Sequence, residues 1–183
     1  FLGALTLAGE VWAAQCGGSG SEGILVTESG GSYTCRPDSG GRFPAVLYSH
    51  GGLGLAVGGD LQGTCEALAH AGYLAYAKLR EDSPMRTIPE HLADVDTAFG
   101  YLIGQTDADT NRVGIIGYSR GGALSYAIAE SRADEIHATV LLAPAPAGNF
   151  LANKTADVTP IEAPIFLGVA RNDINQADHV GIV

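Results

Sequence analysis

The sequence predicts an α/β fold: a mostly parallel, doubly wound sheet with helices on both faces. Short apolar runs, typical of buried strands, alternate along the chain with segments of helical periodicity. Strands of parallel sheets are covered on both faces and read as near-continuous apolar runs, so the alternation favours such a sheet. The 26 glycines indicate tight turns between the elements. With 183 residues, 46% of them hydrophobic, the chain has the size and apolar content of one domain.

The elements can be placed in order along this pattern. A helix is expected over 89–102, where apolar residues recur at helical spacing and Pro89 suits the first turn. The segment 144–164 is long and irregular, and is either a lid or binding loop or a plain crossover with one weak helix. The other expected helices cover 60–71 and 120–132, and the expected strands cover 24–27, 32–35, 45–49, 73–79, 113–116, 138–142 and 165–169.

The chain is expected to consist of a signal-peptide remnant at 1–13 and a single α/β domain at 14–183. Residues 1–8 are apolar, and the small residues that follow are typical of a secretory signal. A secreted or periplasmic location is therefore expected, with the cytoplasm as the alternative. Because no run reaches about 18 apolar residues, no transmembrane helix is expected. The formal charge of −10 argues against nucleic acid and anionic lipid as partners.

The three cysteines, Cys16, Cys35 and Cys65, contain no Cys-x-x-Cys pair, so the sequence gives no support for a zinc or redox site. We expect neither a metal nor a cofactor. Cys16 and Cys35 flank a Gly/Ser-rich stretch and could form a disulfide in an oxidising compartment. The alternative is three unpaired thiols.

The motif Gly117-Tyr118-Ser119-Arg120-Gly121 is the strongest chemical signal. It follows the expected strand at 113–116 and opens the helix expected from residue 120. A sharp strand-to-helix turn holds such a serine in a strained, exposed position at the carboxyl edge of the sheet. The helix N-terminus behind it favours developing negative charge. We therefore interpret Ser119 as a nucleophile for acyl transfer.

A second motif, His50-Gly51-Gly52-Leu53-Gly54, ends an earlier expected strand. Acyl transfer requires two backbone N–H groups aimed at the oxyanion that develops on the substrate. We expect one from Arg120, which follows the nucleophile, and the other from Gly52 or Leu53. His50 itself is expected to be a structural residue of this loop rather than the catalytic base.

The remaining catalytic groups should follow in the order acid, then histidine. Asp173 comes just after the expected strand at 165–169 and is the predicted orienting acid, with Asp178 as a weaker candidate. His179 follows Asp173 too closely for a helix and strand to intervene, so we expect a surface residue there. The sequence therefore predicts a base beyond Val183, an incomplete C-terminal part, and little turnover by these residues alone.

The run Arg80-Glu81-Asp82 closes the strand expected at 73–79 and so lies at the same edge of the predicted sheet. We expect a solvated, charged loop. The alternative is contact with substrate.

Three segments resemble the dienelactone hydrolase family and its acyl-peptidase and acetyl-esterase relatives: residues 42–52, 71–73 and 111–122. The resemblance extends over about residues 24–173 and implies one α/β-hydrolase domain without a cofactor, acting on an ester, a lactone or an amide. Dienelactone hydrolases in the narrow sense carry a cysteine nucleophile, whereas this chain has Ser119, which favours a general carboxylesterase. The family's C-terminal histidine has no matching position here.

Together these observations predict a serine hydrolase that cleaves small carboxylic esters or lactones through an acyl-enzyme intermediate. An acyl-peptidase-like amide hydrolase is one alternative. A non-catalytic binding module on a hydrolase scaffold is another, because a fold does not fix a function. The sequence gives no indication of the oligomeric state.

Overall fold

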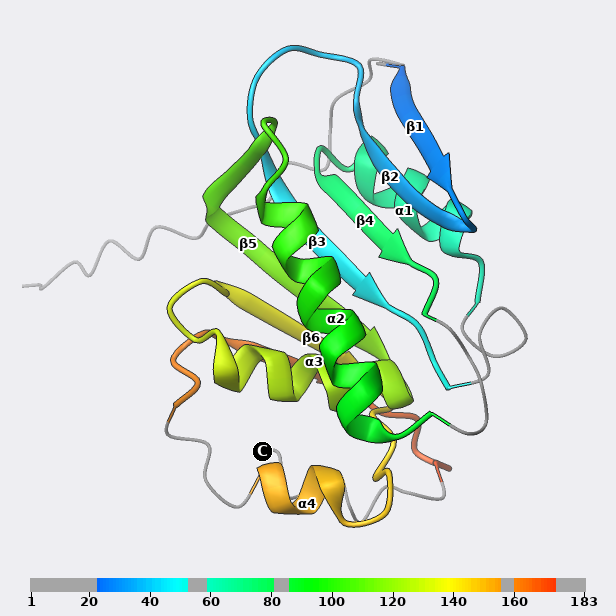
Figure 1. The fold of residues 1–183 in the computed structure, drawn as a ribbon, viewed down its shortest axis with the longest axis vertical. Coiled ribbons are helices and arrows are strands. Elements are labelled where there is room, and N and C mark those ends of the chain that lie inside the picture. The colour runs from blue at the N-terminus through cyan, green and yellow to red at the C-terminus, as the bar shows by residue number, and fades with distance from the viewer. Residues whose placement is uncertain (1–22, 53–58, 81–85, 156–159, 174–183) are drawn as a thin grey trace, which may run out of the picture.

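Seven strands form one sheet among residues 23–52, 59–80, 86–155 and 160–173, which are the residues that the computed structural model describes (Figure 1). The strands are β1 (Ile24–Ser29), β2 (Ser32–Pro37), β3 (Phe43–Ser49), β4 (Leu74–Lys78), β5 (Ala108–Tyr118), β6 (Ala138–Leu142) and β7 (Ile165–Gly168). Their order across the sheet is β1-β2-β4-β3-β5-β6-β7. The pairs β1–β2 and β2–β4 are antiparallel and the other four are parallel. The predicted mostly parallel sheet is confirmed.

The helices cover both faces of this sheet, as predicted. On β3, Ala45 and Leu47 pack into the core beneath α2 and α3, while Tyr48 points to the opposite face and packs with Leu61 and Cys65 of α1. Figure 1 shows α2 and α3 on the near side of the sheet and α1 on the far side. The helices are α1 (Leu61–His70), α2 (Ile88–Ile103), α3 (Arg120–Ser131) and α4 (Phe150–Lys154). None of the described helices is both long and apolar enough to span a membrane.

Strand β5 is the element whose extent differs most from the prediction. It begins at Ala108 rather than at 113, because Phe43 pairs with Ala108 and a register shift between Pro44 and Ala45 lets the pairing continue to Ser49. Residues 109–112 are polar, so the apolar pattern that marks the rest of β5 does not extend to them.

The described part of the segment 144–164 fits the crossover alternative rather than a lid. Its helix α4 packs against α3, where Leu151 is buried in a cluster with Ala123 and Tyr126. Lys154 also forms an ion pair with Glu130 of α3 at 2.5 Å.

A disulfide joins Cys35 on β2 to Cys65 on α1, with their Cα atoms 5.6 Å apart. Both residues are fully buried. The expected pairing of Cys16 with Cys35 is therefore wrong, and so is the alternative of three free thiols; Cys16 lies outside the described residues. The reason is that Cys35 faces the side of the sheet that α1 covers, a tertiary relationship that cysteine spacing does not reveal.

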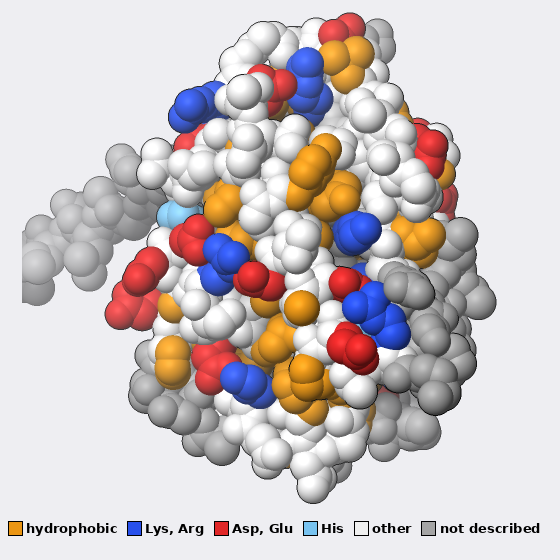
Figure 2. Space-filling view, viewed as in Figure 1, with side chains coloured by type: hydrophobic (Ala, Val, Ile, Leu, Met, Phe, Trp, Pro, Cys, Tyr) orange, Lys and Arg blue, Asp and Glu red, His pale blue; other side chains and the backbone are white. Residues whose placement is uncertain are grey.

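The near face of the molecule carries charges of both signs. Figure 2 shows acidic and basic side chains beside one another on the face that α2 and α3 cover. One such pair is Arg132 with Asp96, whose Nε and Oδ1 atoms are 2.6 Å apart. Partly exposed pairs of this kind each contribute about 0–1 kcal/mol. They keep this face from being uniformly acidic despite the net charge of −10.

Helix α2 begins with a capping box. The Thr87 hydroxyl accepts from the Glu90 N–H at 3.4 Å, and the Glu90 carboxylate accepts from the Thr87 N–H at 2.6 Å. The Thr87 hydroxyl also donates to the Glu90 carboxylate at 2.8 Å. The bond from the Thr87 N–H and, to a smaller extent, the bond from its hydroxyl hold the pKa of Glu90 below its ordinary value. The ionised Glu90 carboxylate therefore stabilises the fold fully at pH values above the ordinary glutamate pKa. This stabilisation is lost as the pH falls through the lowered pKa of Glu90.

Replacing Thr87 with alanine is expected to lower the free energy of unfolding by about 1 kcal/mol, because it leaves the Glu90 N–H at the helix start without its acceptor. Urea denaturation at neutral pH measures the difference. Thr97→Ala is the matched control: its hydroxyl donates to the Ala93 carbonyl within α2, and alanine favours a helix. Equal losses in both variants would contradict the cap assignment.

Candidate active site

Ser119 sits at the turn between β5 and α3 with a backbone that side chains rarely adopt. Its φ is 52° and its ψ is −120°. The turn is held by hydrogen bonds on both sides: the Ser119 N–H donates to the Leu142 carbonyl on β6 at 2.9 Å, and the Ser119 carbonyl accepts from the Gly122 and Ala145 N–H groups at 2.9 and 2.8 Å. The surrounding strands and helix thus stabilise a strained serine at the carboxyl edge of the sheet.

The two glycines of the motif are required because the turn is so tight. A Cβ on Gly121 would run into the carbonyl oxygens of Ser49 and His50, and one on Gly117 would run into the carbonyl oxygen of Gly121. The backbone of α3 therefore lies directly against the end of β3. This close approach brings the His50-Gly51-Gly52 loop next to Ser119.

The two described residues predicted to supply oxyanion N–H groups, Gly52 and Arg120, lie together beside Ser119. A Cβ on Gly52 would be 3.1 Å from Nε and 3.3 Å from Cζ of Arg120, so the Arg120 side chain covers this glycine. A Cβ on Gly51 would be 3.5 Å from the Ser119 Cβ. The other predicted donor, Leu53, lies outside the described residues.

Arg80 is a buried part of this site and not a solvated charge, so that expectation is wrong. Its side chain is 2% exposed. Its guanidinium donates from Nη1 to the Ser49 Oγ at 2.9 Å and from Nη2 to the carbonyls of His50 and Gly51 at 2.7 and 3.0 Å. Arg80 follows β4, which pairs directly with β3, and the two strands end side by side. Glu81 and Asp82 lie outside the described residues.

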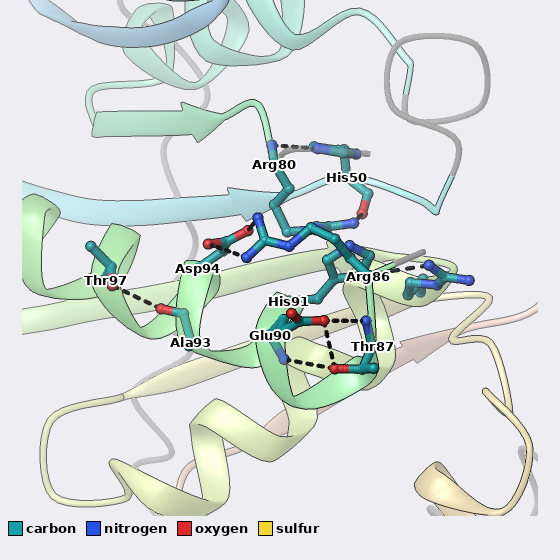
Figure 3. A network of polar contacts seen from close by, with 10 residues as sticks. His50, Arg80, Arg86, Thr87, Glu90, His91, Ala93, Asp94 and Thr97 are labelled. Carbon is teal, nitrogen blue, oxygen red and sulfur yellow. Dashed lines mark hydrogen bonds and ion pairs between the residues drawn. The ribbon is translucent and has the colours of Figure 1, made fainter. Parts of the chain in front are cut away.

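The His50 ring uses both of its nitrogens, which confirms its predicted structural role. Its Nε2 accepts from the Arg80 N–H at 2.9 Å, and its Nδ1 lies 2.7 Å from the Gly51 carbonyl (Figure 3). Since Nε2 accepts, Nδ1 carries the proton and donates to that carbonyl. The ring is 1% exposed and is not available to take a proton from Ser119.

Tyr48 lies one residue before Ser49 on β3, also near this edge. Burial, with a smaller contribution from Tyr118, raises its pKa above the ordinary tyrosine value, although Arg80 acts in the opposite direction. The Tyr48 phenol is therefore neutral at physiological pH.

His91 reaches the site from α2 and was not singled out in the sequence. It is 1% exposed, and its Nδ1 lies 3.5 Å from the Arg120 Nη1. The signal that could have found it is its register, because His91 falls on the same helical face as the buried Val95, Phe99 and Leu102. It connects α2 to the residue that follows Ser119.

Asp173, the predicted acid, lies at the same edge of the sheet as Ser119. It follows β7 in a turn in which its N–H donates to the Ala170 carbonyl at 3.0 Å, and it is half-buried. β7 is parallel to β6, and β6 to β5, so their carboxyl ends share one edge. Asp178 and His179 lie outside the described residues. Within the described part of the chain, no hydrogen bond joins the Ser119 hydroxyl to another side chain.

An apolar groove of about 360 Å³ lies elsewhere, over β3, β5 and β6. Its lining includes Pro44, Val113 and Ala138, which lie near the starts of these strands, together with Leu68 of α1. Ser119 follows the opposite end of β5, so the groove is not the place where Ser119 would act. No group of three or more His, Cys, Asp or Glu side chains suited to a metal ion occurs among the described residues.

A family model described as the dienelactone hydrolase family matches residues 31–180. The chain belongs to the dienelactone hydrolase family. Membership confirms the predicted resemblance and the α/β-hydrolase fold. A comparison with proteins of curated function gave no match.

Solved structures share this fold. A dienelactone hydrolase candidate from Klebsiella pneumoniae subsp. pneumoniae is similar with a TM-score of 0.58 at 17% identity, over 86% of this chain and 90% of that one. Est1E from Butyrivibrio proteoclasticus, solved with ferulic acid bound, is similar with a TM-score of 0.54 at 18% identity, over 66% of this chain and 52% of that one. A hyperthermophilic esterase from the archaeon Pyrobaculum calidifontis is similar with a TM-score of 0.50 at 25% identity, over 67% of this chain and 44% of that one. The chain therefore spans about half the length of Est1E and of the archaeal esterase.

Proposed function

We propose that this chain is a serine hydrolase that cleaves carboxylic esters or lactones through an acyl-enzyme intermediate. The observation that supports it best is the strained backbone of Ser119, at φ 52°, between β5 and α3 and beside Gly52 and Arg120. Strain of this kind persists where the surrounding structure maintains it, and it is common at active sites. Membership of a hydrolase family and the similarity to an esterase support the same reaction class.

In the proposed reaction the Ser119 oxygen bonds to the carbonyl carbon of a small ester or lactone, and the serine proton passes to a base. The negative charge on the carbonyl oxygen is stabilised by the Arg120 N–H together with that of Gly52 or Leu53. The bond between the carbonyl carbon and the alcohol oxygen then breaks, and the base returns its proton to that oxygen. The alcohol departs from an ester, whereas in a lactone it stays joined to the acyl chain. Water then attacks the acyl-enzyme and releases the acid from the serine, whose oxygen regains a proton. Asp173 is the residue proposed to orient a histidine base.

A non-catalytic binding module remains the second candidate. It is compatible with one observation: among the described residues, no side chain hydrogen-bonds to the Ser119 hydroxyl, and the base of the proposed hydrolase is expected outside these residues. A test must therefore detect the reactivity of Ser119 itself and not depend on rapid turnover.

The test is covalent labelling with a fluorophosphonate of the protein expressed from its complete natural gene (the parent), followed by mass spectrometry of the digested protein. We expect an adduct on the peptide that contains Ser119, because phosphonylation produces the same charge on oxygen that acyl transfer does. Ser119→Ala is expected to remain unlabelled. Ser131→Ala, which removes a hydroxyl that donates to the Ile128 carbonyl within α3, is the matched control and should label like the parent. An unlabelled parent would favour the binding module.

We also propose that the protein works in an oxidising compartment, outside the cell or in the periplasm. The buried Cys35–Cys65 disulfide and the apolar stretch at 1–8 support this location. Fractionation of cells that express the natural gene, with an antibody against the chain, would test it. Recovery in the cytoplasm would contradict it.

A further inference from the structure

The peptide between Gly51 and Gly52 is held more firmly than a surface loop normally is. Its carbonyl oxygen accepts two hydrogen bonds, one from the Arg80 Nη2 at 3.0 Å and one from the His50 Nδ1 at 2.7 Å. The His50 ring is anchored in turn by the Arg80 N–H at 2.9 Å, so both donors depend on one residue. Figure 3 shows this connection between Arg80 and His50. All the groups involved are buried, where such bonds are strongest.

This arrangement sets the direction of one N–H group. In a planar trans peptide the N–H of a residue points opposite to the carbonyl of the residue before it. Because Arg80 and His50 fix the Gly51 carbonyl, they also fix the Gly52 N–H, which points away from them. In the direction in which side chains would leave the two glycines, Gly51 faces Ser119 and Gly52 faces the Arg120 side chain. The loop is therefore clamped between a buried arginine and the turn that carries the proposed nucleophile.

We propose that Arg80 is a positioning residue for the oxyanion site. Its guanidinium, together with the His50 ring that its own N–H anchors, fixes the Gly51–Gly52 peptide and so aims the Gly52 N–H at the oxygen that becomes negative. The inference rests on the proposed function, and it selects Gly52 over Leu53 as the second donor. It requires the planar, multiply donating guanidinium, because three acceptors on Ser49, His50 and Gly51 are bound at once.

The test compares two reagents that differ in the atom held by the oxyanion site: diethyl 4-nitrophenyl phosphate and its phosphorothioate, in which sulfur replaces the phosphoryl oxygen. In both, the Ser119 oxygen bonds to phosphorus, the bond to 4-nitrophenolate breaks, and the serine proton is released. Sulfur accepts hydrogen bonds weakly, so aimed N–H donors accelerate the oxygen reagent selectively. The rate constant for the oxygen reagent divided by that for the sulfur reagent reports how well the N–H donors are aligned. This ratio does not depend on the folded fraction of the protein, because both reagents react with the same folded molecules.

For the parent, we expect this ratio to exceed the ratio for hydrolysis of the two reagents in water. Arg80→Lys keeps the charge but loses the fork of donors, and is expected to slow the oxygen reagent about 10- to 100-fold and the sulfur reagent much less. His50→Asn, which cannot accept from the Arg80 N–H in the same place, should lower the ratio in the same direction without removing the buried charge. Arg112→Lys, at an exposed ion pair with Asp109 near the start of β5, is the matched control and should leave both rates unchanged.

Two results would overturn the inference, and they are distinguishable. If Ser119 reacts in the parent but the ratio is unchanged in both Arg80→Lys and His50→Asn, the positioning role is wrong and the proposed function stands. If the parent shows no reaction at Ser119 with either reagent, the proposed function and the inference fail together.

Discussion

Replacing Gly121 with alanine is expected to lower the free energy of unfolding by about 3 kcal/mol and to abolish labelling of Ser119. The added Cβ would collide with the carbonyl oxygens of Ser49 and His50, which are backbone atoms and not the movable end of a side chain. Forcing extra volume into such a packed site typically costs 1–3 kcal/mol and shifts the backbone. Here the shift would separate α3 from the end of β3, and with them Ser119 from the His50-Gly51-Gly52 loop.

The effect on labelling should exceed the effect on stability, and the two can be separated. Urea denaturation gives the stability, and the fluorophosphonate labelling rate is measured where the variant is still folded. Gly100→Ala on α2 is the matched control, because a Cβ at that exposed position meets nothing within 4 Å. It is expected to stabilise the helix by about 0.5–1 kcal/mol and to label normally. Normal labelling of folded Gly121→Ala would contradict the close packing assigned to this turn.

The parts of the fold that could be predicted are those set by short-range pattern. Strand β6 has the predicted limits, 138–142, because four of its five residues are apolar and turn residues bound them. The position of Ser119 between β5 and α3 followed from a motif whose glycines have no alternative. In both cases neighbouring residues in the chain are enough to predict the feature, although Gly121 is required by its contact with the distant Ser49 and His50 carbonyls.

The parts that could not be predicted depend on contacts between distant segments. Arg80 reads as one charge in a charged run, and only the pairing of β4 with β3 brings it to the His50 and Gly51 carbonyls. Cys65 reads as one of three thiols, and only the packing of α1 on the sheet places it against Cys35. The His50-Gly51-Gly52 loop was therefore predicted as a motif, whereas the arginine that supports it was not.

Removing the disulfide is expected to lower the free energy of unfolding by about 3–4 kcal/mol. Cys35 and Cys65 are 30 residues apart in sequence, and a crosslink of that span restricts the unfolded chain by about that amount in the chain-entropy model. The double variant Cys35→Ala/Cys65→Ala also loses buried sulfur atoms between β2 and α1, which adds to the effect. Urea denaturation with and without dithiothreitol measures both contributions.

The reductant separates the crosslink from the packing. We expect dithiothreitol to destabilise the parent strongly and the double variant hardly at all, because only the parent has a bond to reduce. Cys16→Ala is the decisive control: with Cys35 bonded to Cys65, its stability and its response to the reductant should match those of the parent. If Cys16→Ala abolished the response instead, Cys16 would be a partner in the bond, and the attachment of α1 to β2 would have to rest on packing alone.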